Sequence, residues 1–149
     1  MFRHFLFSFC EEVSDGKARC SCYTFINDSP KPWLEAFNYC ARKSSKKHLV
    51  VMETEREWKF ITKEIQTRKG GKENEWHIGL ERNSKTGWTW INGKTIIIDK
   101  WQRGKPRDSD LFTLMAKEFP LGFKGSFSSI NESVNRGWIC EEETGINTV

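Results

Sequence analysis

The spacing of apolar residues predicts two helices in the first half of the chain. From Trp33 to Cys40, apolar residues recur at positions i, i+3, i+4 and i+7, which indicates a helix from residue 32 or 33 to about residue 42. A second apolar face runs from Trp58 to Ile65 at the same spacing. Thr54 with Glu57 three residues later is a capping box, so this second helix should begin there.

The rest of the pattern predicts short strands. Apolar runs bounded by turn residues indicate strands at residues 23–26, 49–52, 76–80, 87–91, 95–98 and 137–140. Asn92-Gly93 between two of these runs is a strong hairpin turn. Periodicity is weak over residues 100–127, where we expect a long irregular loop. Helices followed by strands predict an α+β fold, with two helices flanking short antiparallel sheets.

Composition limits the class of protein. A chain of 149 residues fits one domain with a core of its own, and its mean hydropathy of -0.65 argues against membrane insertion. The formal net charge of +4 permits an acidic partner but gives no reason to expect nucleic acid. No nucleophile stands in a motif with a neighbouring base, and His77 lies inside an expected core strand, so we do not expect an enzyme.

Cysteines and glycosylation motifs favour an extracellular location. The five cysteines stand at positions 10, 20, 22, 40 and 140, and an odd number leaves one thiol for a free state or an intermolecular bond. N-glycosylation motifs occur at Asn27 and Asn131, with Pro30 after the first lowering its expected use. The apolar run after Met1 is too short for a signal peptide and fits a first strand equally well. Together these features predict an oxidising compartment, either secreted or on the cell surface.

A series of sequence landmarks runs through residues 22–141. They are Cys22-Tyr23, the segment from Trp33 to Cys40, Leu49-Val50-Val51, the segment from Glu55 to Ile61, Trp76-His77-Ile78-Gly79-Leu80, Trp88-Thr89-Trp90-Ile91-Asn92-Gly93-Lys94, Trp101-Gln102-Arg103-Gly104-Lys105-Pro106 and Trp138-Ile139-Cys140-Glu141. In this order they resemble the C-type lectin-like domain. The resemblance implies a domain at residues 22–143, preceded by an extension or hairpin at 1–21 and followed by a tail at 144–149.

The resemblance also implies the disulfides. Cys40 on the first helix should pair with Cys140 on the last strand, and closing a loop of that length is worth about 4–5 kcal/mol in the loop-entropy model. In longer members of the family an N-terminal hairpin carries a second disulfide, which here would join Cys10 to Cys22 or to Cys20. We favour Cys22, because Cys-Tyr is the family's usual second position. The remaining thiol would then be available to link two chains.

The chain departs from the family where sugar-binding members hold calcium. Those members place a carboxylate and an amide on either side of a cis-proline, whereas here Lys105 and Arg107 flank Pro106. The family's second ligand motif aligns with Phe127-Ser128-Ser129, which has neither amide nor carboxylate. Because a hard cation needs several oxygen ligands, we expect no calcium at this position and no other cofactor. The family's inner disulfide is absent too.

The same loop carries the residues that we expect to bind a ligand. Four cations, flanked by two acidic residues at the rim, fall on the family's ligand-binding loop: Lys100, Arg103, Lys105 and Arg107, with Asp108 and Asp110. Guanidinium groups bind sulfate, carboxylate and similar anions in a bidentate manner. Trp101 within this run is expected to anchor the loop in the core rather than stack on a ligand.

We therefore expect a domain that binds a protein or an anionic glycan through the long-loop surface without calcium. Two alternatives remain open. A calcium-dependent lectin would need rearranged carboxylates, such as Asp108, Asp110 and Glu132, to converge, or a secondary site at Glu141. A structural or matrix protein would instead use the odd cysteine to link chains.

Overall fold

In the part of the chain that the structure describes, eight strands join into one mixed sheet, with a helix on either side of its central strands. The computed structural model describes residues 6–14, 16–68 and 74–148. The elements are β1 (Leu6–Ser14), β2 (Lys17–Lys31), α1 (Trp33–Lys43), β3 (Lys47–Leu49), α2 (Glu55–Gln66), β4 (Glu75–Asn83), β5 (Gly87–Trp90), β6 (Phe112–Ala116), β7 (Phe127–Ile130) and β8 (Arg136–Thr148). This arrangement confirms the predicted α+β class.

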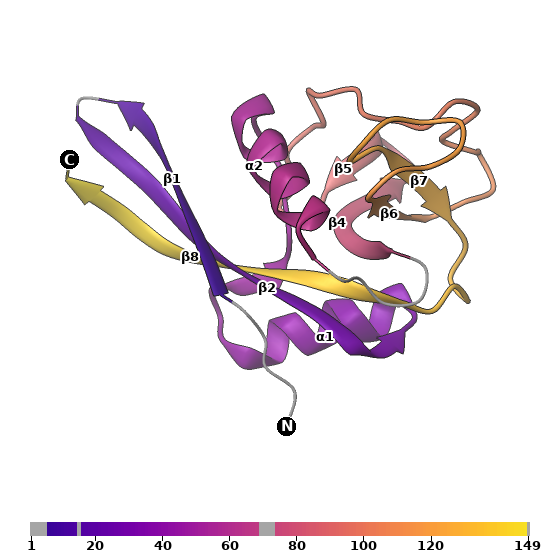
Figure 1. Ribbon diagram of the computed structural model, residues 1–149, viewed down its shortest axis with the longest axis horizontal. Helices are drawn as coiled ribbons and strands as arrows, with labels where there is room; N and C mark the ends of the chain where they lie inside the picture. Colours follow the sequence, from indigo (N-terminus) through magenta and orange to yellow (C-terminus); the bar gives the residue numbers. More distant parts are fainter. Residues whose placement is uncertain (1–5, 15, 69–73, 149) are drawn as a thin grey trace.

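The strand order explains how the two ends of the chain meet. The sheet runs β1-β2-β8-β4-β6-β7, with β3 paired to β8 and β5 paired to β4. All pairs are antiparallel except β4 with β8. In Figure 1, β1, β2 and β8 form a long arm, α1 and α2 lie on opposite sides of the β2–β8 pair, and the long loop lies at the far end from the arm.

Helix α1 follows the predicted apolar spacing. Its buried residues are Trp33, Ala36 and Cys40, and Pro32 occupies the N-cap position. Trp33 fixes the helix against the sheet, because its indole Nε1 donates to the carbonyl oxygen of Ile78 at 2.7 Å. The Trp33 ring also stacks on Phe112, with ring centroids 4.2 Å apart.

Helix α2 begins at the predicted cap. The Thr54 hydroxyl accepts a hydrogen bond from the backbone N–H of Glu57 at 3.1 Å. The returning bond is shifted by one residue, because the Glu57 carboxylate accepts from the N–H of Glu53 rather than from that of Thr54. Ile61 and Ile65 are fully buried on the inner face of this helix.

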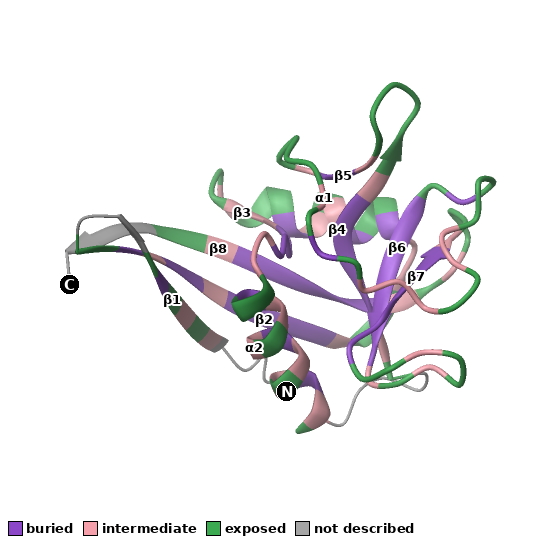
Figure 2. Ribbon diagram, turned by 90° about the horizontal axis from the view of Figure 1, so that it is seen from above, coloured by how far each residue is buried: buried purple, intermediate pink, exposed green. Residues whose placement is uncertain are grey.

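The larger part of the core lies between α2 and the sheet, and a smaller part packs around α1. Figure 2 shows the buried residues concentrated in β2, β4, β6 and β8. Trp76 and Trp90 are among the largest of its fully buried side chains. Val50 joins two parts of the sheet, since its N–H donates to Ile139 and its carbonyl accepts from Gly79. A Cβ on Gly79 would lie 2.8 Å from the Val50 oxygen, so this close approach requires glycine.

Three strand predictions differ from the structure. β3 ends at Leu49, and Val50 to Met52 are buried outside any strand. After the Asn92-Gly93 turn the second hairpin strand does not form: only Thr95 bridges back to Thr89, and Ile97 is 76% exposed. The region expected to be irregular contains β6, whose five residues are all buried and therefore show no alternation of apolar and polar positions.

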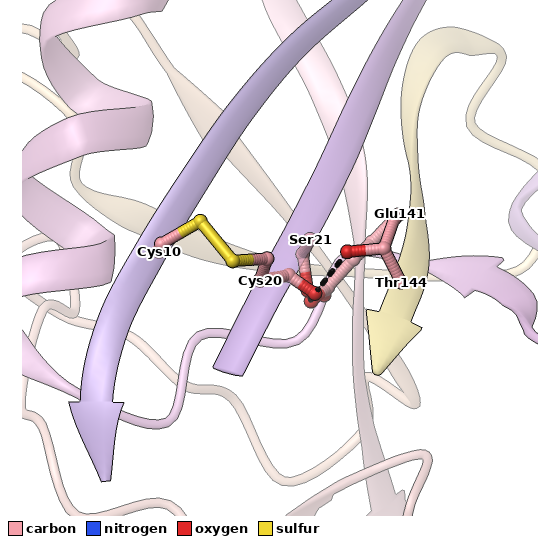
Figure 3. Close-up of a disulfide and its surroundings, with 5 residues drawn as sticks. All are labelled: Cys10, Cys20, Ser21, Glu141 and Thr144. Atoms are coloured by element: carbon pink, nitrogen blue, oxygen red, sulfur yellow. Dashed lines mark hydrogen bonds between the residues drawn. A yellow bond between two sulfur atoms is a disulfide. The ribbon is translucent and has the colours of Figure 1, made fainter. Parts of the chain in front are cut away.

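The two disulfides correct one predicted pairing. Cys40 bonds Cys140 as expected, tying α1 to β8 across 100 residues. Cys10 bonds Cys20 and not Cys22, and Cys22 is free of any disulfide. The β1–β2 register decides this, because Cys10 lies directly opposite Cys20 whereas Cys22 lies opposite Ser8. Figure 3 shows the bond between the two strands, with Thr144 of β8 donating to the Cys20 carbonyl oxygen.

The arm is continuous with the rest of the sheet. The expected domain boundaries, between residues 21 and 22 and between residues 143 and 144, both fall inside strands. The first lies within β2 and the second within β8. The N-terminal hairpin itself is present as β1 and β2. Residues 1–5, which include the start of the suggested leader, lie outside the described residues.

Candidate functional site on the long loop

The aromatic anchor of the long loop is Trp101. Its backbone forms a parallel bridge to Phe127 at the start of β7. Two hydrogen bonds make this bridge: the Gln102 N–H donates to the Phe127 carbonyl oxygen, and the Phe127 N–H donates to the Lys100 carbonyl oxygen. The Trp101 ring packs edge-on against Trp88, with centroids 5.1 Å apart. Trp101 therefore packs against the core, as predicted, and fixes the start of the basic run.

Lys105 points into the protein. Its Nζ donates to the carbonyl oxygen of Ser129 at 2.9 Å and lies 3.5 Å from the Asp110 carboxylate. Ser129 completes the group, since its hydroxyl donates to the same Asp110 oxygen at 2.7 Å and accepts from the backbone N–H of Arg107. We call Lys105, Asp110 and Ser129 the loop cluster. The side chains of Lys105 and Asp110 are only 17% and 12% exposed. Lys105 therefore does not face a ligand, and Asp110 does not lie at the rim, contrary to the two expectations.

Arg103 and Arg107 are the cations that face solvent. Both are exposed, one on each side of Lys105-Pro106, whose peptide bond is cis as the family resemblance implied. Among the described residues, no carboxylate pairs with either guanidinium. Asp108 is also exposed and lies beside Arg107 in the sequence. This part of the predicted site is available to a ligand.

Lys100 belongs to a different contact. Its Nζ pairs with Glu55 of α2 at 2.7 Å and lies 3.9 Å from the centroid of the Trp58 ring. The Lys100 side chain is 16% exposed, because most of it packs against α2. Lys100 therefore differs from the two arginines, although all three lie in one basic run.

Sequence analysis missed an apolar edge beside the arginines. Leu121 is 60% exposed and Phe123 is 42% exposed. The backbone N–H of Arg103 donates to the Leu121 carbonyl oxygen at 3.0 Å, which places this edge against the basic run. Phe123 packs edge-on against Trp58, with centroids 6.1 Å apart. In the sequence, Leu121 and Phe123 are large apolar residues within a polar, glycine-containing stretch before β7, and this pattern could have predicted the edge.

A second polar group is buried between α2 and the arm. The Tyr23 hydroxyl donates to Glu57, and the Ser21 hydroxyl donates to Glu141 at 2.7 Å. Both carboxylates are 4% exposed. Burial, reinforced by the negative charge of Glu141, raises the pKa of Glu57 to about 8, and burial raises the pKa of Glu141 to about 7. Glu141 and Asp110 have different partners, and the structure does not join them in one group.

The remaining predicted residues are separate from these groups. His77 is fully buried and its Nε2 lies 2.7 Å from the Lys31 carbonyl oxygen, as fits a core histidine. The Asn27 amide oxygen accepts from the indole of Trp76, whereas Asn131 is exposed. Cys22 is half-buried, and a link between chains through it stays a prediction that non-reducing gel migration would test.

The fold and these landmarks are those of a C-type lectin-like domain. A family model described as "Lectin C-type domain" matches residues 29–142, so the chain belongs to the C-type lectin domain family. Neither helix among the described residues is long and apolar enough to span a membrane.

Relatives and solved structures agree with this assignment. The chain is 31% identical to human lithostathine-1-beta over 107 residues, which is 71% of this chain and 63% of that protein. It is 27% identical to mouse C-type lectin domain family 4 member G over 128 residues, 83% of this chain and 40% of that protein. The chain thus spans less than two thirds of either relative.

Two solved structures share the fold. The C-type lectin domain of murine dendritic cell inhibitory receptor 2, in complex with N-glycan, is 23% identical with a TM-score of 0.69, covering 83% of this chain and 91% of its own. The Ca2+-independent C-type lectin SPL-2 from Saxidomus purpuratus is 22% identical with a TM-score of 0.69, covering 81% of this chain and 85% of its own.

Proposed function

We propose that this domain binds an anionic ligand outside the cell, without calcium and without catalysis, through Arg103 and Arg107 on the long loop. The carrying observation is that both guanidinium groups are exposed and lack a carboxylate partner among the described residues. Each can form a bidentate, charge-assisted pair with a sulfate or carboxylate. The ligand is an acidic protein surface or a sulfated or sialylated glycan.

The loop cluster supports independence from calcium. Sugar-binding members of the family hold calcium beside the cis-proline, whereas the Asp110 carboxylate of this chain already faces the Lys105 ammonium and the Ser129 hydroxyl. A calcium ion takes six to eight oxygen ligands and would be repelled by the ammonium. The residues present therefore do not fit the ion. One structural neighbour, SPL-2, is itself a Ca2+-independent C-type lectin.

The apolar edge favours a protein ligand. Protein interfaces combine buried apolar anchors with arginine, and Leu121 and Phe123 stand next to Arg103. A glycan ligand would rely on the two guanidinium groups alone. The two ligand classes thus differ in whether Leu121 contributes to binding.

The test is an array of sulfated and sialylated glycans and of acidic proteins, probed with and without a calcium chelator. For the best binder, Arg103→Glu and Arg107→Glu should each lower affinity about tenfold or more, as the loss of a hydrogen bond to a charged group implies. Arg42→Glu, on the exposed face of α1, makes the same charge change and should alter affinity less than about twofold.

Three results would contradict the proposal. These are unchanged binding in both arginine variants, an equal loss in the Arg42 variant, and loss of binding on adding chelator. The last of these would favour the calcium-dependent lectin instead. A loss of binding in Leu121→Ser would identify a protein ligand.

A further inference from the structure

One histidine and two glutamates converge where β3 meets β8, away from the long loop. His48 of β3 lies directly opposite Glu141 in the antiparallel register. Glu143 is two residues further along β8 and so projects from the same face of the strand as Glu141. Among the described residues, these three form a group whose ligand atoms all lie within 4.8 Å of one another.

The spacing of the ligand atoms is close to that of a metal site. His48 Nε2 lies 3.9 Å from Glu143 Oε1. In a tetrahedral zinc site with bonds of about 2.1 Å, neighbouring ligand atoms lie about 3.4 Å apart. The Glu143 side chain is 50% exposed and the His48 side chain 25%, so both can move closer. The other ligand-atom separations, which reach up to 4.8 Å, would also shorten when an ion binds.

Neighbouring groups already orient the ligands. His48 Nδ1 lies 2.7 Å from the carbonyl oxygen of Leu49. A carbonyl only accepts, so this contact places the proton on Nδ1 of the neutral ring and leaves the Nε2 lone pair facing the glutamates. Glu141 is held by two donors, the Ser21 hydroxyl at 2.7 Å and the Val51 N–H at 3.0 Å. Metal-binding histidines and carboxylates are typically held in this way by a second layer of hydrogen bonds.

The charges at this place call for a cation. Glu141 is 4% exposed. With both carboxylates ionised, Glu141 and Glu143 carry two negative charges beside the imidazole, which a divalent ion would balance. A nitrogen ligand favours zinc and similar transition metals over calcium or magnesium.

We propose that His48, Glu141 and Glu143 bind a divalent transition metal ion, with Zn²⁺ the best fit. Three protein ligands leave at least one coordination position for water. The ion would fasten β3 to β8 beside the Cys40–Cys140 disulfide and would stabilise the fold rather than contact the ligand of the long loop.

The test is titration of the purified full chain with Zn²⁺ alone, followed by calorimetry and by thermal unfolding. Zn²⁺ should bind with a stoichiometry of one and raise the melting temperature. His48→Gln and Glu143→Gln should each weaken binding at least about tenfold and remove the thermal shift. Glu142→Gln is the matched control, because it removes the same charge from the next residue of β8, whose side chain projects from the other face. Its affinity should stay within about twofold of wild type.

A further variant excludes the free thiol as the ligand. Cys22→Ser should bind Zn²⁺ as the wild type does. Wild-type affinity in either the His48 or the Glu143 variant, or loss of binding in Cys22→Ser alone, would overturn the proposal. So would the absence of saturable binding to the wild type. Anionic-ligand binding by Glu143→Gln should be unchanged, so this test and that of the long-loop function fail independently.

Discussion

The Lys105–Asp110 pair is expected to stabilise the long loop, and its contribution can be measured. At 3.5 Å, the gross attraction between unit charges is about 5 kcal/mol for an effective dielectric constant of about 20. Desolvation offsets much of this, so we expect Lys105→Met to lower the free energy of unfolding by roughly 2 kcal/mol. For a chain of 149 residues that corresponds to a fall in melting temperature of roughly 4–8 °C.

A double-mutant cycle isolates the pair from other effects of the substitution. The variants are Lys105→Met, Asp110→Asn and the two together, unfolded by urea and followed by tryptophan fluorescence. The double variant should be more stable than the two single losses predict, by about 1–2 kcal/mol, because the neutral amide at position 110 leaves no unpaired charge buried. Lys124→Met, at an exposed position before β7, should cost less than about 0.5 kcal/mol. Additive single and double losses would refute the argument.

Two other predictions concern the arm and its contact with α2. Because the pKa values of Glu57 and Glu141 are raised in the folded state, the folded chain binds more protons than the unfolded chain between about pH 4.5 and pH 8. The free energy of unfolding should therefore fall as pH rises through this range, by at most about 1.4 kcal/mol per pH unit for each proton, and Glu57→Gln should flatten the slope in urea unfolding. Peptide mapping without reduction should recover Cys10 linked to Cys20, and recovery of Cys10 linked to Cys22 would show that the β1–β2 register is wrong.

Local sequence patterns predicted the helices well. The apolar spacing of α1 and the Thr54 cap of α2 are properties of neighbouring residues, so they can be recognised without the fold. β6 was missed because a strand buried on both faces has no alternation. The partner of Cys10 depended on strand register, which one residue of slip would change.

The candidate site was predicted only in part, for a similar reason. The family resemblance located the basic run and the cis-proline, and two of its four cations, Arg103 and Arg107, are exposed. The inward direction of Lys105 depends on Ser129, a residue 24 positions away that β7 brings beside it. No local pattern reports such a contact. The convergence of His48 with Glu143 likewise follows from the pairing of β3 with β8.

The disulfide between α1 and β8 also affects what a protease can do to this domain. Cys40 and Cys140 are 100 positions apart, and the segment between them includes the long loop with both exposed arginines. A single cut anywhere within that span produces two pieces that stay covalently joined, and their strands remain paired in one sheet. One cut in the long loop therefore releases no fragment, and the two pieces separate only when the disulfide is reduced.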